Sequence, residues 1–223
     1  MKEWSLRELA SRIDHTLLKP QATDEEVRRL CREALEWGCA SACVNPARLP
    51  AAVEVLAGSS VKACSVAAFP LGAADGETRL FETRRAVALG AREVDTVVEL
   101  GLVKARAWKK VEAQVRHQVE AARPADLKVI LETGLLEEEE IRRLVDLCAR
   151  AGAAFVKTST GFGPRGATVE DVRILADAAA GRIRVKASGG IRTREQALAL
   201  LEAGADRLGT SATAKILEGL EGA

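Results

Sequence analysis

The chain alternates short apolar runs with longer amphipathic stretches from end to end, and this pattern limits its fold more than any other feature. Eight apolar runs are candidate strands: His15–Leu18, Ser41–Asn45, Lys62–Phe69, Glu93–Leu100, Lys128–Thr133, Phe155–Ser159, Arg184–Ser188 and Arg207–Thr210. Between them the apolar period changes to that of a helix, as in Ile141, Leu144, Val145 and Cys148. Strands that alternate with helices indicate a parallel sheet.

The helix starts are marked by capping residues. Thr23 with Glu26, and Thr193 with Gln196, have the spacing of capping boxes, in which each side chain binds a free backbone N–H. Eight βα units without a long linker in 223 residues predict one (β/α)8 TIM barrel, a single domain over residues 1–223. An open doubly wound sheet is the alternative.

The charge balance and residue usage exclude several functions. With 33 basic and 32 acidic side chains, the chain lacks the basic field that binds nucleic acid or an anionic membrane. The N-terminal segment is charged and no run reaches a membrane span, so we expect a cytoplasmic protein. Its five cysteines contain no C-x-x-C and are expected to be reduced. His15 and His117 are far apart, which disfavours a catalytic zinc and a metal-assisted mechanism. No cofactor is predicted.

Side-chain alternation along the strands predicts which polar residues face the barrel interior. In Arg184–Ser188, Val185 and Ala187 suit the side that faces the helices, so Lys186 should point inward. The same reasoning turns further polar residues inward: Asp14, Cys43, Asp95, Glu99, Lys157, Ser159, Arg184 and Ser188. We interpret Cys43 as a small buried thiol that fills space.

Two inward lysines beside one inward aspartate favour chemistry over packing. Branched aliphatic residues normally fill a barrel interior, and a lone buried pair of Lys and Asp would be a structural ion pair. Lys157 and Lys186 lie on consecutive strands, however, so repulsion and desolvation favour the loss of one proton. A neutral amine beside a cation is the arrangement that activates a Schiff-base lysine.

The segments after the last three strands predict an anion site. Glycines let backbone N–H groups approach an anion, helix N-termini favour negative charge, and the loops after strands 7 and 8 are the usual phosphate site of barrels. The candidate residues are Gly161, Ser188, Gly189, Gly190, Gly209, Thr210 and Ser211, with Gly163 as a further glycine and Arg182, Arg184 and Arg192 as supporting arginines. A small phosphorylated substrate is therefore expected.

With these residues in place, the chain resembles the deoxyribose-phosphate aldolases over nearly its whole length. The segments that carry the resemblance are Ile13–Pro20, Ala42–Pro46, Val66–Gly72, Glu93–Val98, Leu127–Thr133, Phe155–Phe162 and Val185–Arg192. K-T-S-T-G-F and K-A-S-G-G-I-R together are the most specific. The resemblance implies a metal-free class I aldolase on a TIM barrel. Such an enzyme interconverts 2-deoxy-D-ribose 5-phosphate with D-glyceraldehyde 3-phosphate and acetaldehyde.

The resemblance also implies roles for three residues. Lys157 would form the Schiff base, Lys186 would lower the pKa of that nucleophile and help to move protons, and Asp95 would donate and accept protons. Two departures affect proton transfer: many members carry asparagine where this chain has Glu99, and this chain lacks the C-terminal tyrosine of some members. The expected partners are a sugar phosphate and aldehydes, and a homodimer is one option.

Two other functions fit the same pattern. A sugar-phosphate isomerase or epimerase would use the phosphate loops with carboxylates or a metal and would form no imine. A non-catalytic sugar-phosphate sensor would keep the barrel and the phosphate loops without turnover. Of the remaining residues, His15 is predicted to be structural, His117 solvated, and the acidic run Glu137–Glu140 the first turn of a helix.

Overall fold

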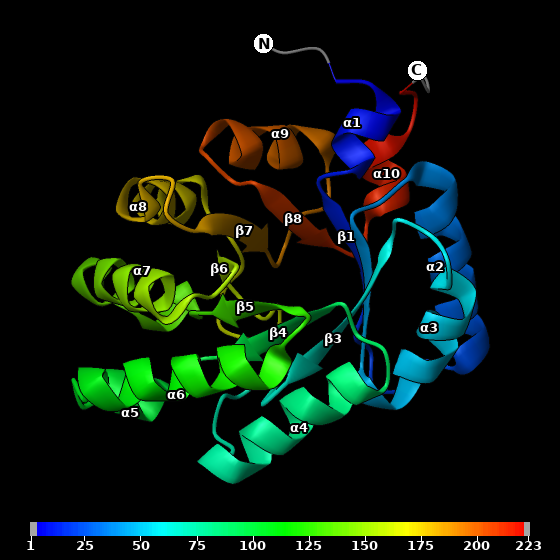
Figure 1. Ribbon diagram of the computed structural model, residues 1–223. Coiled ribbons are helices and arrows are strands. Elements are labelled where there is room, and N and C mark those ends of the chain that lie inside the picture. The colour runs from blue at the N-terminus through cyan, green and yellow to red at the C-terminus, as the bar shows by residue number, and fades with distance from the viewer. Residues whose placement is uncertain (1–3, 221–223) are drawn as a thin grey trace.

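In the computed structural model, which describes residues 4–220, eight parallel strands form a closed barrel (Figure 1). The strands are β1 Ile13–Leu17, β2 Ser41–Val44, β3 Lys62–Ala67, β4 Glu93–Val97, β5 Asp126–Ile130, β6 Phe155–Lys157, β7 Arg184–Ser188 and β8 Arg207–Thr210. Each strand pairs with its sequence neighbour, and β8 closes the barrel on β1 with Leu208 opposite Ile13. The closure confirms the predicted TIM barrel and rules out the open sheet.

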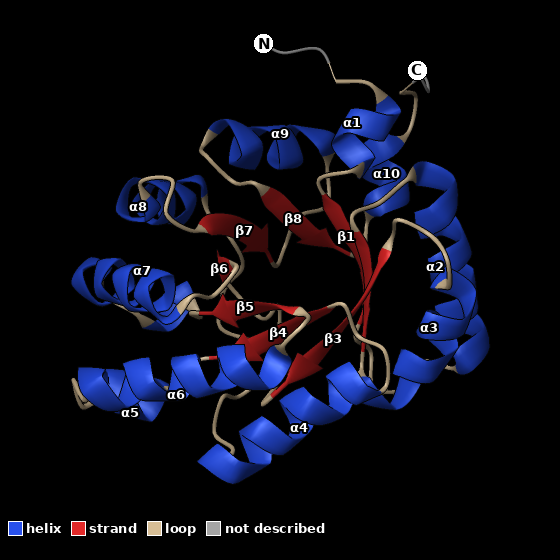
Figure 2. Ribbon diagram, viewed as in Figure 1, coloured by secondary structure: helices blue, strands red, loops and turns tan. Residues whose placement is uncertain are grey.

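Helices surround the strands as an outer layer (Figure 2). The α-helices are α1 Leu6–Ala10, α2 Asp24–Trp37, α3 Leu49–Leu56, α4 Gly76–Ala88, α5 Leu100–Lys104, α6 Trp108–Ala122, α7 Glu138–Ala151, α8 Val169–Ala179, α9 Arg194–Glu202 and α10 Thr213–Leu217, with 3-10 turns at Pro46–Arg48 and Thr133–Leu135. No helix in the described range has both the length and the apolar character that a membrane span requires.

The helix boundaries follow from the capping residues. Both predicted capping boxes form, because Thr23 caps α2 and Thr193 caps α9 with reciprocal backbone contacts. At the other end, α7 stops at Gly152, whose φ of 85° is left-handed and suits a residue without a Cβ. These signals turn the chain back toward the sheet at a defined point.

Two apolar regions support the barrel. The larger one lies between the sheet and the helices and includes the outward-facing Val94, Val156 and Val185, as strand alternation predicts. The smaller one includes Cys43 and Cys64, which face each other on β2 and β3. The thiol of Cys43 therefore fills buried space, as predicted.

The prediction that Glu99 faces the barrel interior is wrong. Strand β4 ends at Val97, and Glu99 is the N-cap residue that precedes α5. Its carboxylate accepts a hydrogen bond from Gln114 Nε2 of α6 at 2.9 Å. The alternation of side chains holds only as long as the strand continues, so a residue two positions past its end turns with the loop.

The loops after β6 and β7 are packed against each other through glycines. A Cβ on Gly166 would lie 2.1 Å from the carbonyl oxygen of Gly189, and a Cβ on Gly189 would lie 3.5 Å from the Cα of Gly161. Residues with side chains would force these loops apart.

We therefore expect Gly166→Ala to lower the free energy of unfolding by about 1–3 kcal/mol, because a backbone atom cannot move aside as a flexible side chain can. Gly101→Ala is the matched control: it lies in α5 with no atom within 4 Å of the added Cβ. Urea denaturation of both variants tests this, and equal stability of the two would contradict the close approach.

Candidate active site

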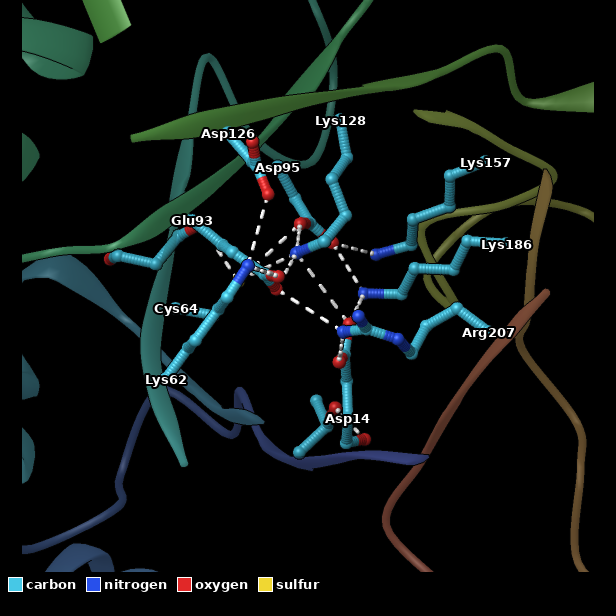
Figure 3. A network of polar contacts seen from close by, with 12 residues as sticks. Asp14, Lys62, Cys64, Glu93, Asp95, Asp126, Lys128, Lys157, Lys186 and Arg207 are labelled. Carbon is cyan, nitrogen blue, oxygen red and sulfur yellow. Dashed lines mark hydrogen bonds and ion pairs between the residues drawn. The ribbon is translucent and has the colours of Figure 1, made fainter. Parts of the chain in front are cut away.

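Three of the predicted site residues meet inside the barrel. Asp95 lies in the middle of β4, Lys157 ends β6 and Lys186 lies in the middle of β7, in register with Lys157. Asp95 Oδ2 accepts hydrogen bonds from Lys157 Nζ and Lys186 Nζ, each at 2.8 Å (Figure 3). All three side chains are buried. One carboxylate oxygen thus links both lysines, which sequence alternation had turned inward.

A third buried lysine also binds the carboxylate of Asp95. Lys128 of β5 donates to Asp95 Oδ1 at 2.8 Å and lies 2.6 Å from Glu93 Oε2 (Figure 3). Sequence reasoning placed Lys128 in a strand and did not assign its direction. The signal was present, since Leu127 and Val129 pack toward the helices and leave Lys128 to face inward.

Further charged residues, nearer the amino ends of the strands, contact these lysines or one another. Asp14 Oδ2 of β1 lies 2.5 Å from Lys186 Nζ, and Asp14 Oδ1 lies 2.6 Å from Arg207 Nη1. Glu93 Oε1 accepts from Lys62 Nζ at 3.0 Å. Figure 3 shows these side chains converging from several strands on the barrel interior. The network therefore spans the barrel. Asp95 belongs with Lys157 and Lys186 to its upper layer, nearer the carboxyl ends of the strands, and Asp14, Glu93 and Arg207 form its lower layer.

The network determines which groups are charged. Burial would raise the pKa of Asp95, but Lys128, Lys157 and Lys186 more than offset it and hold that pKa well below its usual value. Burial would likewise lower the pKa of Lys128 and Lys186. Neighbouring carboxylates raise both, chiefly Asp95 for Lys128 and Asp14 for Lys186. Asp95 is therefore an anion that faces two firmly protonated lysines.

The acid sensitivity of the protein should reveal this network. Despite burial, Lys186 and Lys128 lower the pKa of Asp14 below its usual 3.8. A carboxylate with a depressed folded pKa stabilises the fold fully above its unfolded pKa, and the contribution declines as pH falls toward the folded pKa. We expect the stability difference between wild type and Asp14→Asn to be constant from about pH 7 to pH 5 and to narrow below about pH 4. Chemical denaturation across this range measures it, and a difference that persists undiminished at pH 3 would contradict it.

One group of residues within the described range has the ligand atoms for a metal ion. Cys43, Cys64 and Asp95 offer atoms that all lie within 4.8 Å of one another. Lys128 Nζ already lies 3.3 Å from Cys64 Sγ, and three lysine amines bind the carboxylate of Asp95. A cation placed there would meet these ammonium groups, so the geometry favours an ion-pair network over a metal centre.

A cavity of about 270 Å³ opens at the carboxyl ends of the strands. All seven predicted phosphate-site residues line it: Gly161, Ser188, Gly189, Gly190, Gly209, Thr210 and Ser211. Lys157 also lines it, whereas Lys128 and Lys186 lie outside its lining. The amine of Lys157 is therefore the one in this trio that faces the space a substrate would occupy.

The cavity wall is suited to an anion. Within residues 4–220, the backbone N–H groups of Gly161, Gly190 and Ser211 donate to no protein acceptor. The hydroxyls of Ser188 and Thr210 hold the loops instead: Ser188 Oγ donates to the carbonyl of Ser159 at 2.6 Å, and Thr210 Oγ1 donates to that of Ile191 at 2.7 Å. Free amides on a fixed backbone are what an oxyanion requires.

Two of the three arginines predicted to support phosphate are elsewhere. Arg192 lines the cavity, together with Lys19, which sequence reasoning did not single out. Arg182 instead binds Asp146 at 2.8 Å, and the guanidinium of Arg184 lies 4.0 Å from the centre of the Phe155 ring. Arg182 and Arg184 precede or begin β7, so they lie at the amino end of the barrel, opposite the cavity.

The histidines have no place in the cavity. His15 Nε2 lies 3.1 Å from Glu33, and His15 Nδ1 lies 2.8 Å from Thr213 Oγ1, between β1 and the outer helices. Its ring packs edge-on against Trp37. His117 is exposed on α6. These positions agree with the structural and solvated roles predicted for them.

A closed barrel whose buried charges meet beneath a cavity at the carboxyl ends of its strands has the architecture of a (β/α)8-barrel enzyme. The model of the DeoC/LacD family of aldolases matches residues 9–219. The chain belongs to this family and is an aldolase, a carbon–carbon lyase.

Named relatives are similar over nearly the whole chain. Deoxyribose-phosphate aldolase 1 of Bacillus licheniformis is 50% identical over 215 residues, which is 96% of each protein. The solved deoxyribose phosphate aldolase of Aeropyrum pernix is 42% identical with a TM-score of 0.90 and covers 96% of this chain and 91% of its own. A putative deoxyribose-phosphate aldolase from Coccidioides immitis is 39% identical with a TM-score of 0.93, covering 96% of this chain and 86% of its own.

Proposed function

We propose that the chain reversibly cleaves 2-deoxy-D-ribose 5-phosphate into D-glyceraldehyde 3-phosphate and acetaldehyde through a Schiff base on Lys157. The observation that carries the proposal is that Lys157 both lines the cavity and lies 2.8 Å from Asp95. The names of the relatives at about half identity support the substrate. The free amides of the cavity wall support a phosphorylated one.

The contacts of the buried cations support Lys157 as the nucleophile. Four buried cations, Lys128, Lys157, Lys186 and Arg207, face three buried carboxylates, Asp14, Glu93 and Asp95. Lys157 contacts a single carboxylate oxygen, which Lys186 also contacts, whereas each other cation approaches at least two carboxylates. Lys157 is therefore the lysine with the fewest carboxylate contacts in the network.

In the first half of the reaction, the neutral amine of Lys157 attacks the C1 aldehyde of the open-chain sugar. The carbinolamine loses water and gives a protonated imine. A base removes the proton from the C3 hydroxyl, the bond between C2 and C3 breaks, and its electron pair passes to the imine, which becomes an enamine. Glyceraldehyde 3-phosphate is the first product to leave.

In the second half, the enamine carbon takes up a proton and water hydrolyses the imine to free acetaldehyde. Asp95 and Lys186 are the groups proposed to move these protons. Asp95 accepts a hydrogen bond from Lys157, and Lys186 donates to the same oxygen of Asp95. The chain contains no tyrosine, so a water held by this pair would carry the proton at the methyl carbon. The phosphate would position the reacting carbons from the other end of the cavity.

The proposal requires no metal or cofactor, since the protonated imine is itself the electron sink. The network around Asp95 supports this, because its ammonium groups occupy the region where a cation would bind.

The proposal also includes a single catalytic domain and a cytoplasmic location, which fit an enzyme of sugar-phosphate breakdown. A structure of the Aeropyrum pernix relative is described as tetrameric. For this chain, a homodimer stays a prediction, which light scattering after size-exclusion chromatography would test.

A coupled assay for glyceraldehyde 3-phosphate, with deoxyribose 5-phosphate as substrate and a chelator present, tests the function. We expect turnover that the chelator does not alter. Binding of the sugar phosphate without turnover would favour the sensor, and conversion to another pentose phosphate would favour the isomerase or epimerase. Loss of turnover in the chelator would contradict metal independence.

A further inference from the structure

Glu132 is a buried carboxylate that the proposed mechanism does not use. It lies two residues past the end of β5, is only 3% exposed, and has the left-handed backbone angles φ 58° and ψ 61°. Its Oε1 atom is buried with no hydrogen-bond partner within the described part of the chain. A strained backbone and an unpaired buried oxygen both cost stability, and such costs are concentrated at functional sites.

The other carboxylate oxygen holds the loop that borders the cavity. Oε2 of Glu132 accepts hydrogen bonds from Thr160 Oγ1 at 2.5 Å and from the Thr160 backbone N–H at 3.3 Å. Thr160 Oγ1 in turn accepts from the N–H of Phe162 at 3.0 Å. Glu132 thus fixes both ends of the short segment 160–162, and all three residues of that segment line the cavity.

The shape of the loop is adapted to this carboxylate. A Cβ on Gly163 would lie 2.6 to 2.9 Å from the carboxylate atoms of Glu132, so the backbone closes directly over the acid. On the opposite side, Gly161 packs on Gly189, which begins the anion-binding turn after β7. Glu132 therefore holds the segment that packs against the turn after β7.

We propose that Glu132 is a positioning residue for the phosphate end of the substrate: through Thr160, it fixes the Gly161 amide at the distance a phosphate requires. This inference rests on the proposed function and deepens it. Glu132 would act on the recognition of the phosphate and leave the chemistry at Lys157 unaffected, because its contacts end at the loop.

The test compares deoxyribose 5-phosphate with 2-deoxyribose, which has the same aldehyde and no phosphate. In Glu132→Ala, we expect kcat/KM for the phosphorylated sugar to fall by at least about tenfold, mainly through KM, because a charge-assisted hydrogen bond is lost. The kcat/KM for 2-deoxyribose should fall by less than about threefold. Thr160→Val, which removes the hydroxyl acceptor and donor, should reproduce the loss. Glu132→Gln keeps one oxygen for Thr160 and should stay within about threefold of wild type.

A general structural role would give a different result. Borohydride trapping of acetaldehyde on Lys157 does not depend on phosphate, and we expect it to be unchanged in Glu132→Ala, as in the exposed control Glu139→Ala. If kcat/KM for both sugars and the yield of trapped acetaldehyde decline together, the inference is wrong. It is also wrong if the ratio of kcat/KM between the phosphorylated and the unphosphorylated sugar is unchanged. Wild-type turnover is measured first, because its absence counts against the proposed function, whereas unchanged preference counts against Glu132 alone.

Discussion

Lys157→Leu is expected to lose aldol cleavage by a factor on the order of 10⁴ or more, because leucine fills similar space and removes the nucleophile of the covalent route. The variant should still bind the sugar phosphate, since the free amides of the cavity wall do not depend on the amine. It should also be about as stable as wild type, because Lys157 contacts a single carboxylate oxygen, which Lys186 also contacts.

The coupled assay and denaturation measure these effects together. Lys110→Leu, on the exposed face of α6, is the matched control and should retain wild-type activity. Lys186→Leu should also be inactive, but for another reason, since it leaves Asp14 without its 2.5 Å partner and should lose stability as well. A Lys157→Leu protein that cleaves the sugar at more than a few per cent of the wild-type rate would exclude an imine on that residue.

Asp95→Asn is expected to reduce both stability and activity. The aspartate is the shared partner of Lys128, Lys157 and Lys186, so its loss removes one of the few carboxylates that balance the buried ammonium groups and should cost about 3–5 kcal/mol of unfolding free energy. The rate should fall by about 10²–10⁴, the range for removal of a general acid–base group.

Asp177→Asn provides the control for the aspartate. Asp177 forms a surface ion pair with Arg142 and is 72% exposed, so its replacement should change stability by at most about 1 kcal/mol. Guanidinium denaturation and the coupled assay cover both variants. If Asp95→Asn is as stable as this control, then Asp95 is not a carboxylate that stabilises the buried ammonium groups of Lys128 and Lys186.

The sequence was sufficient to predict the barrel and the upper layer of the site for a simple physical reason. Side chains alternate along a strand, and parallel strands place their carboxyl ends at one end of the sheet. Val156 and Val185 suit the side of their strands that faces the helices, so Lys157 and Lys186 were predicted to face inward. The structure places both lysines there, in register. The same rule failed for Glu99 because β4 ended two residues earlier.

The remainder of the site depends on distances across the barrel, which alternation does not provide. Glu93 and Arg207 approach within 3.4 Å although 114 positions separate them in the chain, and no local pattern reports such a contact. Glu132 lies past the end of a strand in a left-handed conformation that glycine or asparagine usually adopts, so its sequence gives no sign of its position. The lower charge layer and the support of the loop therefore required the structure.

The most direct test of the account is to locate the imine. Wild-type protein is treated with limiting acetaldehyde and borohydride, digested and analysed by mass spectrometry, with Lys157→Leu in a parallel sample. We expect one ethyl group, on Lys157, formed in proportion to the loss of activity, and no site-specific ethyl group in Lys157→Leu. An ethyl group on Lys186 or Lys128, or labelling spread over surface lysines with activity retained, would contradict the central claim.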